Sequence, residues 1–254
     1  MDSKELSDLL AFAKHVAEDA GALTLEYFKG VLEVEYKEDR TPVTIADRKA
    51  EELIRDQIQT EFPDHAIIGE EYADKASDSQ YRWIIDPIDG TKSFIRGVPL
   101  YSILIACEYE NTPKLGVIHI PPLKETVSAA IGLGCKHNNK PCRVSETSSL
   151  CKSSIHVTDF ADLYRRRPRF TERLLSEVES CRTWGDAYGY FLVATGRADV
   201  MIDPIMQHWD IAPLMPIITE AGGKFTDLDG NPTPIGNSSL ASNGKLHQQV
   251  LELL

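Results

Sequence analysis

The chain has 254 residues, of which 42% are hydrophobic, so it can bury a substantial core as one large domain or two small ones. Its formal net charge of -12 argues against binding to a nucleic-acid backbone, and no apolar run approaches the length of a membrane span. Five cysteines without a Cys-x-x-Cys pair, together with an N-terminus that lacks a secretion signal, indicate a cytoplasmic protein with reduced thiols.

The first predicted elements form a scaffold. Apolar residues recur at helical spacing between residues 6 and 20, which predicts a helix that stops at Gly30. Alternation over residues 31–36 predicts a half-exposed strand, and residues 37–44 are expected to be a polar loop.

The next helix is expected to begin at Ile45 and to continue to about Glu61. Thr44 is followed three positions later by Asp47, which is the spacing of a reciprocal helix cap. Asp47 can therefore be explained by capping alone.

Two short apolar strands then end in acidic residues. Residues 66–69 lead into Glu70 and Glu71, and the buried run 83–85 leads into Asp86. If these strands are parallel neighbours, their ends lie side by side. Of Glu70 and Glu71, we expect Glu70 to bind a metal ion directly. We expect Glu71 to lie further from the metal or in solvent.

The turn after Asp86 is the most informative stretch of the chain. Pro87 has no N–H for a ladder hydrogen bond, so the strand is expected to stop, and Asp89-Gly90 then predicts a tight turn. Asp86 and Asp89 should point toward one place, where they repel each other unless a proton or a cation lies between them. Carboxylate oxygens suit Mg²⁺. Asp-Pro and Asp-Gly are also ordinary turn dipeptides, so a purely structural interpretation stays open.

The middle of the chain contains a turn, a junction and further regular elements. Residues 132–140 are expected to form a turn, and a Ser/Thr/Glu-rich segment over 144–152 marks a junction between an N-terminal part, 1–147, and a C-terminal part, 148–254. An amphipathic helix is expected over residues 171–181. Further strands are expected over residues 101–106, 115–120, 126–130, 154–158 and 198–202.

Four later acidic residues have a plain structural explanation. Asp186 and Asp210 are placed to begin helices, with Asp210 capping a helix over residues 211–221. Asp227-x-Asp229-Gly resembles the aspartyl-phosphate motif of haloacid dehalogenase phosphatases. The chain that follows it is too short for the α/β domain that motif requires, which favours a hairpin turn.

Three separated motifs resemble the inositol monophosphatase family of Mg²⁺-dependent phosphatases, and the resemblance covers nearly the whole chain. They are Gly69-Glu70-Glu71, then Asp86-Pro-Ile-Asp89-Gly90-Thr91, then Trp209-Asp210-Ile-Ala-Pro with Glu220-Ala-Gly-Gly223. The resemblance implies a layered α/β fold, the αβαβα sandwich of the inositol monophosphatase / fructose-1,6-bisphosphatase type, and a homodimer.

The resemblance also assigns roles to residues. It implies that two or three Mg²⁺ ions are held by Glu70, Asp86, Asp89, Asp210 and the carbonyl of Ile88. Asp47 would act with Thr91, beside Glu70, to orient and deprotonate the attacking water. The phosphate would bind at the amides of Gly90 and Thr91, and Asp89 and Asp210 would also contact the substrate. Asp186 and Arg182 would face the leaving group.

The substrate expectation rests on one branch of the family. Gly185-Asp186-x-Tyr188-x-Tyr190 and Arg96-Gly97-Val98-Pro99 resemble the histidinol-phosphate phosphatase branch, which implies L-histidinol phosphate as the small-molecule phosphate ester. The alternatives are inositol 1-phosphate, a sugar bisphosphate or a 3′-phosphoadenosine compound. A non-catalytic scaffold with the same fold is a more distant alternative.

Overall fold

The structure is a computed structural model that describes residues 1–30, 34–37 and 41–254. Its helices are α1 (Ser3–Tyr27), α2 (Ile45–Glu61), α3 (Thr91–Phe94), α4 (Phe160–Arg166), α5 (Pro168–Glu177), α6 (Asp186–Ala194), α7 (His208–Glu220) and α8 (His247–Leu251). None of the helices in these ranges combines the length and the apolar character needed to cross a bilayer.

The described strands form two large sheets and a small ribbon. The ribbon pairs β1 (Val34–Tyr36) with β2 (Pro42–Thr44). The larger sheet has the order β3 (Ala66–Gly69), β4 (Tyr81–Asp89), β5 (Ser102–Tyr109), β6 (Thr112–Ile120), β7 (Glu125–Ala130), β8 (Gly134–His137) and β9 (Lys140–Pro141). The smaller sheet has the order β11 (Ser180–Arg182), β10 (Ser154–Val157), β12 (Val200–Asp203), β14 (Ser239–Ser242) and β13 (Lys224–Thr226).

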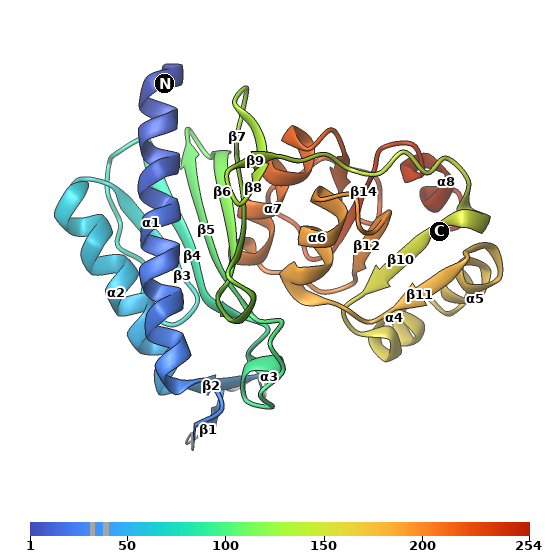
Figure 1. Cartoon of the computed structure of the whole chain (residues 1–254), viewed down its shortest axis with the longest axis horizontal. Helices are drawn as coiled ribbons and strands as arrows, with labels where there is room; N and C mark the ends of the chain where they lie inside the picture. The colour runs from blue at the N-terminus through green and yellow to red at the C-terminus, as the bar shows by residue number, and fades with distance from the viewer. Residues whose placement is uncertain (31–33, 38–40) are drawn as a thin grey trace.

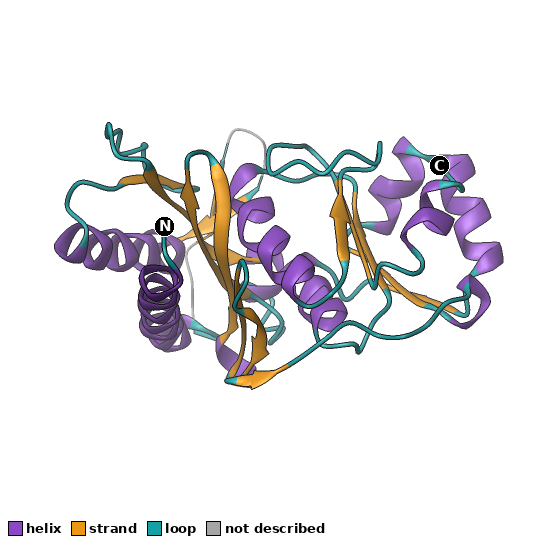
Figure 2. Ribbon diagram, turned by 90° about the horizontal axis from the view of Figure 1, so that it is seen from above, coloured by secondary structure: helices purple, strands orange, loops and turns teal. Residues whose placement is uncertain are grey.

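These elements stack in five layers (Figures 1 and 2). Helices α1 and α2 cover the outer face of the larger sheet, and α6 and α7 lie between the two sheets, with α4, α5 and α8 beyond the smaller one. The fold is therefore the expected αβαβα sandwich. The boundary predicted at residue 147 stays a prediction. One apolar core joins α6 and α7 to both sheets, so the two parts share buried residues.

Close packing holds α7 against the larger sheet. A Cβ added to Gly116 of β6 would lie 2.0 Å from the carbonyl oxygen of Pro213, so only glycine lets the helix approach this near. Ile211, Leu214 and Ile218 of α7 are buried in the core that the helix shares with the two sheets. This packing fixes where the N-terminal end of α7, and with it Asp210, meets the sheet.

Several predicted elements are confirmed, among them α2 with its Thr44–Asp47 reciprocal cap and the parallel pairing of β3 with β4. Residues 31–33 of the strand predicted at 31–36, and residues 38–40 of the predicted loop, lie outside the described residues. Within that loop, residues 42–44 form β2 instead.

Two other predictions are wrong. Residues 132–140 contain the hairpin of β8 and β9, because Asn138 and Asn139 both adopt the positive φ that a two-residue hairpin turn requires. The helix predicted at 171–181 is α5, which begins at Pro168 and ends at Glu177. The following residues turn to pair as β11 with β10 in parallel.

Candidate active site

The acidic turn lies at the end of β4, where this strand has one residue more than its partner strand β5. Asp86 pairs with Leu104 and Asp89 with Ser102, so the ladder loses one step of register between them. The prediction that the strand stops after Asp86 is wrong, because this bulge accommodates Pro87 and pairing resumes at Asp89. A bulge turns side chains toward a new direction, and it brings both carboxylates to one side of the sheet.

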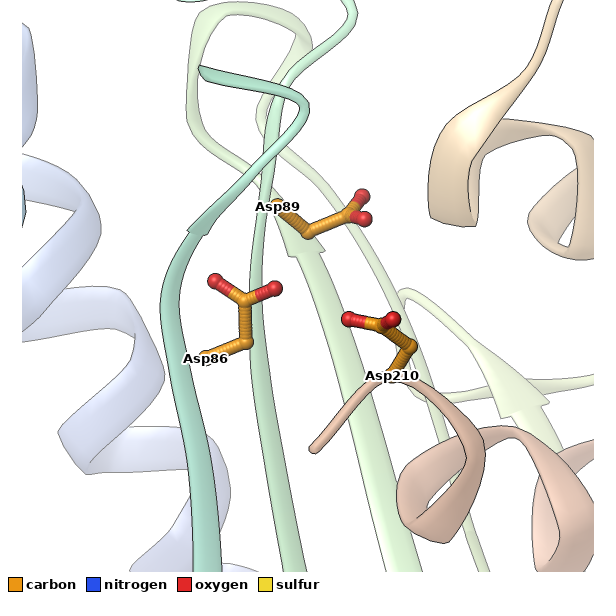
Figure 3. Close-up of side chains that lie close together, drawn as sticks. All are labelled: Asp86, Asp89 and Asp210. Carbon is orange, nitrogen blue, oxygen red and sulfur yellow. The ribbon is translucent and has the colours of Figure 1, made fainter. Parts of the chain in front are cut away.

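Asp210 approaches the same place from α7. Asp210 is the third residue of α7 and accepts the N–H of Gln207 at 2.7 Å, so Gln207, and not Asp210, is the N-cap. One carboxylate oxygen each from Asp86, Asp89 and Asp210 lies within 4.8 Å of the others. Figure 3 shows the three side chains converging from β4 and α7. We call this group the carboxylate cluster.

The cluster is electrostatically unfavourable by itself. Burial raises the pKa of Asp86 and Asp89 well above the usual value, and neighbouring carboxylates raise them further. Burial also raises the pKa of Asp210 to about 7. Buried, oxygen-only ligands that must otherwise take up protons fit the donor set that Mg²⁺ prefers.

Glu70 follows β3 and lies beside this cluster. Its negative charge contributes to the raised pKa values of Asp86 and Asp210. Lys37 donates to Glu70 Oε1 at 2.8 Å and to Glu71 Oε1 at 2.7 Å, so an ammonium bridges the two glutamates. The ligand role of Glu70 stays a prediction, which its place next to Asp86 favours.

Asp47 and Thr91 meet across the turn. Thr91 Oγ1 lies 3.3 Å from Asp47 Oδ1 and donates to the Ile88 carbonyl at 3.0 Å, while Thr44 donates to Asp47 Oδ2 from both its N–H and its hydroxyl. Burial raises the pKa of Asp47 to about 6. Asp47 therefore combines its capping role with a contact to the predicted catalytic threonine.

Gly90 has a conformation that few other residues adopt. Its φ is +80°, and an added Cβ would lie 2.9 Å from Asp186 Oδ2. Glycine thus allows the turn and the Asp186 carboxylate to lie close together. Asp186 itself has a φ of +52° and follows the N-cap Gly185, so it is the first residue of α6 and not its cap.

A cavity of about 290 Å³ joins the carboxylate cluster to the start of α6. Asp89, Asp186 and Asp210 line it, and so does Asp203 at the end of β12. The Ala187 N–H donates to Asp89 Oδ2 at 2.8 Å, which ties α6 directly to the cluster.

Asp203 was missed in the sequence, although Asp203-Pro204 follows a buried strand as Asp86-Pro87 does. Thr158 donates to Asp203 at 2.6 Å and accepts the N–H of Asp186 at 2.9 Å. Burial raises the pKa of Asp203 to about 8, with the charges of Asp186 and Asp210 adding to the effect. A cation in this part of the cavity would relieve that cost.

Arg182 lies apart from the other predicted site residues. It is exposed at the end of the edge strand β11, its guanidinium donates to the Cys181 carbonyl at 2.9 Å, and it is not among the residues that line the cavity. Its substrate-binding role stays a prediction. The side chain of Lys92, to which the sequence assigned no role, lines the cavity, and its positive charge opposes the rise in the pKa of Asp186.

Comparisons with known proteins show which family of proteins and which fold the chain resembles. The model of the inositol monophosphatase family matches residues 5–254. A histidinol-phosphatase of Chlorobaculum parvum is 45% identical, with 92% of this chain and 91% of that protein covered, and one of Mycobacterium tuberculosis is 36% identical, with 97% and 98% covered. The crystal structure of the extragenic suppressor protein suhB from Bartonella henselae superposes with a TM-score of 0.92 at 28% identity, covering 97% of this chain and 98% of that one.

Proposed function

Because the chain belongs to the inositol monophosphatase family of metal-dependent phosphomonoesterases, we propose that it hydrolyses L-histidinol phosphate to L-histidinol and phosphate. Two or three Mg²⁺ ions would be held by Asp86, Asp89 and Asp210 with Glu70 and the Ile88 carbonyl. The similarity to histidinol-phosphatases over nearly the whole chain supports this choice of substrate.

The observation that carries the substrate proposal is the acidic half of the cavity. Beyond the carboxylate cluster, Asp186 and Asp203 line the space where the alcohol part of a phosphate ester would lie. Histidinol carries an amine and an imidazole, both of which can be cationic, and a cation beside two buried carboxylates offsets the cost of burying them. A neutral alcohol would leave that cost in place.

The contacts within the site support a separate role for each group in the reaction. Bound Mg²⁺ supplies Lewis-acid stabilisation of charge on the phosphate oxygens and acidifies the attacking water. The Thr91 hydroxyl, within 3.3 Å of Asp47, orients that water, and the Asp47 carboxylate takes up its proton. The pKa of Asp47, raised to about 6, suits a base that works near neutral pH. Ser102 and the Ala187 N–H fix the orientation of the Asp89 carboxylate at 2.8 Å each.

Inositol 1-phosphate is the second candidate. The same carboxylates that would pair with a cationic leaving group can accept hydrogen bonds from the hydroxyl groups of a polyol. The family's own description favours this alternative. A sugar bisphosphate is supported by the names of relatives that are both fructose-1,6-bisphosphatases and inositol-1-monophosphatases. A nucleotide phosphate and a non-catalytic scaffold have no such observation in their favour.

The test is phosphate release from a matched panel, first with Mg²⁺ and then with a chelator. We expect histidinol phosphate to be turned over with a higher kcat/KM than inositol 1-phosphate or glycerol phosphate, and we expect the chelator to abolish all turnover. A higher kcat/KM for inositol 1-phosphate would make that ester the substrate in place of histidinol phosphate. No phosphate release from any ester would favour the non-catalytic scaffold. Gel filtration or sedimentation of the same protein measures the expected homodimer.

A variant separates the leaving-group contact from the chemistry. Asp186→Asn keeps the shape of the side chain and tolerates the φ of +52° that Asp186 adopts. We expect kcat/KM for histidinol phosphate to fall by about 10-fold or more, the effect of one charge contact of about 1.4 kcal/mol or more, with glycerol phosphate little affected. Asp56→Asn, at an exposed position on α2, is the matched control for lost charge. Equal losses on both esters would contradict the assignment of Asp186.

A further inference from the structure

Two cysteines far from the carboxylate cluster face each other beside the β8–β9 hairpin. The Sγ atoms of Cys135 and Cys142 lie 3.5 Å apart and form a thiol–thiol hydrogen bond. Neither residue has a part in the proposed reaction. Cys107, Cys151 and Cys181, the other cysteines of the chain, have no such thiol–thiol contact among the described residues.

The backbone already holds the pair in a geometry that a disulfide accepts. Lys136 pairs with Pro141 in the hairpin, so Cys135 and Cys142 are opposite each other one step further along, and the Cys142 N–H donates to the Cys135 carbonyl at 3.1 Å. Directly opposed residues joined in this way have Cα atoms about 5.5 Å apart, within the range of about 4.4–6.8 Å that disulfides span. To close the bond, the two sulfurs must approach from 3.5 Å to the disulfide length of about 2 Å.

The two thiols differ in the way that a reactive and a resolving cysteine differ. Cys142 is half-buried and open to a small oxidant, whereas Cys135 is only 4% exposed. The contact between the two sulfurs lowers the pKa of the Cys142 thiol, while the same contact and burial raise the pKa of Cys135. The accessible sulfur therefore favours the nucleophilic thiolate, with a protonated thiol beside it.

We propose that Cys142 and Cys135 are a redox modification site that closes to a reversible disulfide when a hydroperoxide oxidises the accessible thiol. The Cys142 thiolate attacks the terminal peroxide oxygen, the O–O bond breaks, and the leaving alkoxide or hydroxide takes up a proton, which leaves a sulfenic acid. The Cys135 sulfur then attacks the Cys142 sulfur, the S–O bond breaks, and water leaves with the Cys135 proton. The peroxide is reduced by two electrons, and a dithiol restores both cysteines.

The position of the bond gives it a structural effect. Cys142 begins the segment that carries the chain from the larger sheet to β10, and two residues later the Val144 N–H donates to the Ala221 carbonyl just after α7. Cys135 packs in the apolar core shared by α6 and α7. The disulfide would tie the start of this connecting segment to the larger sheet, and it would protect Cys142 from irreversible oxidation.

The experiment uses the full chain with Cys151→Ser, which removes the exposed thiol and leaves four others. After treatment with hydrogen peroxide, we expect the protein to become lighter by two hydrogen atoms, to lose two of its four titratable thiols and to recover both with dithiothreitol. Trypsin cuts after Lys136 but not between Lys140 and Pro141, so the two cysteines fall on separate peptides. A non-reducing digest should contain the peptides 125–136 and 137–143 linked to each other.

Cys142→Ser in the same background is the matched variant, because a half-buried position tolerates this small change. It should keep its mass and its thiols under the same treatment. The proposal is overturned if the parent gains oxygen at Cys142 without the linked peptides, if another cysteine pair is linked, or if Cys142→Ser loses two thiols as the parent does. None of these readouts depends on phosphatase activity.

Discussion

The Asp89→Asn substitution tests whether the carboxylate cluster is held together against its own repulsion. The asparagine has nearly the same shape, and its side-chain oxygen can still accept the hydrogen bonds from Ser102 and from the Ala187 N–H. What it removes is one negative charge whose nearest acidic neighbours include Asp186 and Asp210. In metal-free protein at pH 8, we expect this variant to be more stable than the parent.

The size of the effect follows from the distances. Two unit charges about 4.8 Å apart interact by about 3 kcal/mol at an effective dielectric constant of about 20 and by about 1 kcal/mol in bulk water. Since the cluster oxygens lie within 4.8 Å of one another, and partial protonation already relieves some of the repulsion, a gain of about 1–3 kcal/mol is expected. For a chain of this size that corresponds to a Tm increase of about 3–10 °C.

The sign of the pH dependence is fixed by the raised pKa values. The folded cluster keeps protons that the unfolded chain releases, so the metal-free parent gains stability as the pH falls from 8 toward 5. The advantage of Asp89→Asn should shrink over the same interval. Thermal unfolding in chelator at both pH values measures this, with Asp56→Asn as the control for net charge and with added Mg²⁺ stabilising only the parent and the control. A Tm for Asp89→Asn at or below that of the control at pH 8 would refute the reasoning.

Further predictions concern the base, the turn and a buried histidine. Asp47→Asn should lower kcat by about 10²- to 10⁴-fold with Mg²⁺ affinity by calorimetry unchanged, and a parallel loss of affinity would count against its role as base. Gly90→Ala should lower stability in denaturant titration by more than Gly132→Ala, because Gly132 has nearly the same φ, +81°, but open space around it. Equal losses would show that the close approach of Gly90 to Asp186 has no cost. Burial lowers the pKa of His247 to about 4, so its contribution is complete above pH 6.5 or so and is lost as the pH falls. Between pH 5 and 6 the parent should therefore lose about 1.4 kcal/mol per pH unit more than His247→Gln in urea titrations, and equal slopes would contradict this.

The resemblance to the inositol monophosphatase family was enough to predict the layered fold and the place of Asp210 beside the other two carboxylates. Asp86 and Asp89 could also be selected from a local signal, a strand that leads into an acidic turn, whose geometry depends on few neighbours. The parallel pairing of β3 with β4 then follows from two short apolar runs that each lead into acidic residues. These features are local enough for residue order to specify them.

What the sequence did not predict depends on contacts between distant segments. The bulge at Pro87 exists because β5 continues to pair beyond it, and the bridge from Lys37 to Glu70 and Glu71 joins residues more than 30 positions apart. Asp203 enters the cavity only because β12 lies beside β10, which places Thr158 next to it. Periodicity and turn signals do not contain these contacts, although the Asp203-Pro204 pair after a buried strand marks Asp203 as a candidate.

The central claim is that side chains from separate parts of the chain form one site for divalent cations. Anomalous diffraction from a crystal of the protein grown with Mn²⁺ in place of Mg²⁺ tests this most directly. We predict a peak bounded by the carboxylates of Asp86, Asp89 and Asp210. Anomalous density only elsewhere in the molecule, with these three side chains free of metal at saturating Mn²⁺, would contradict the account.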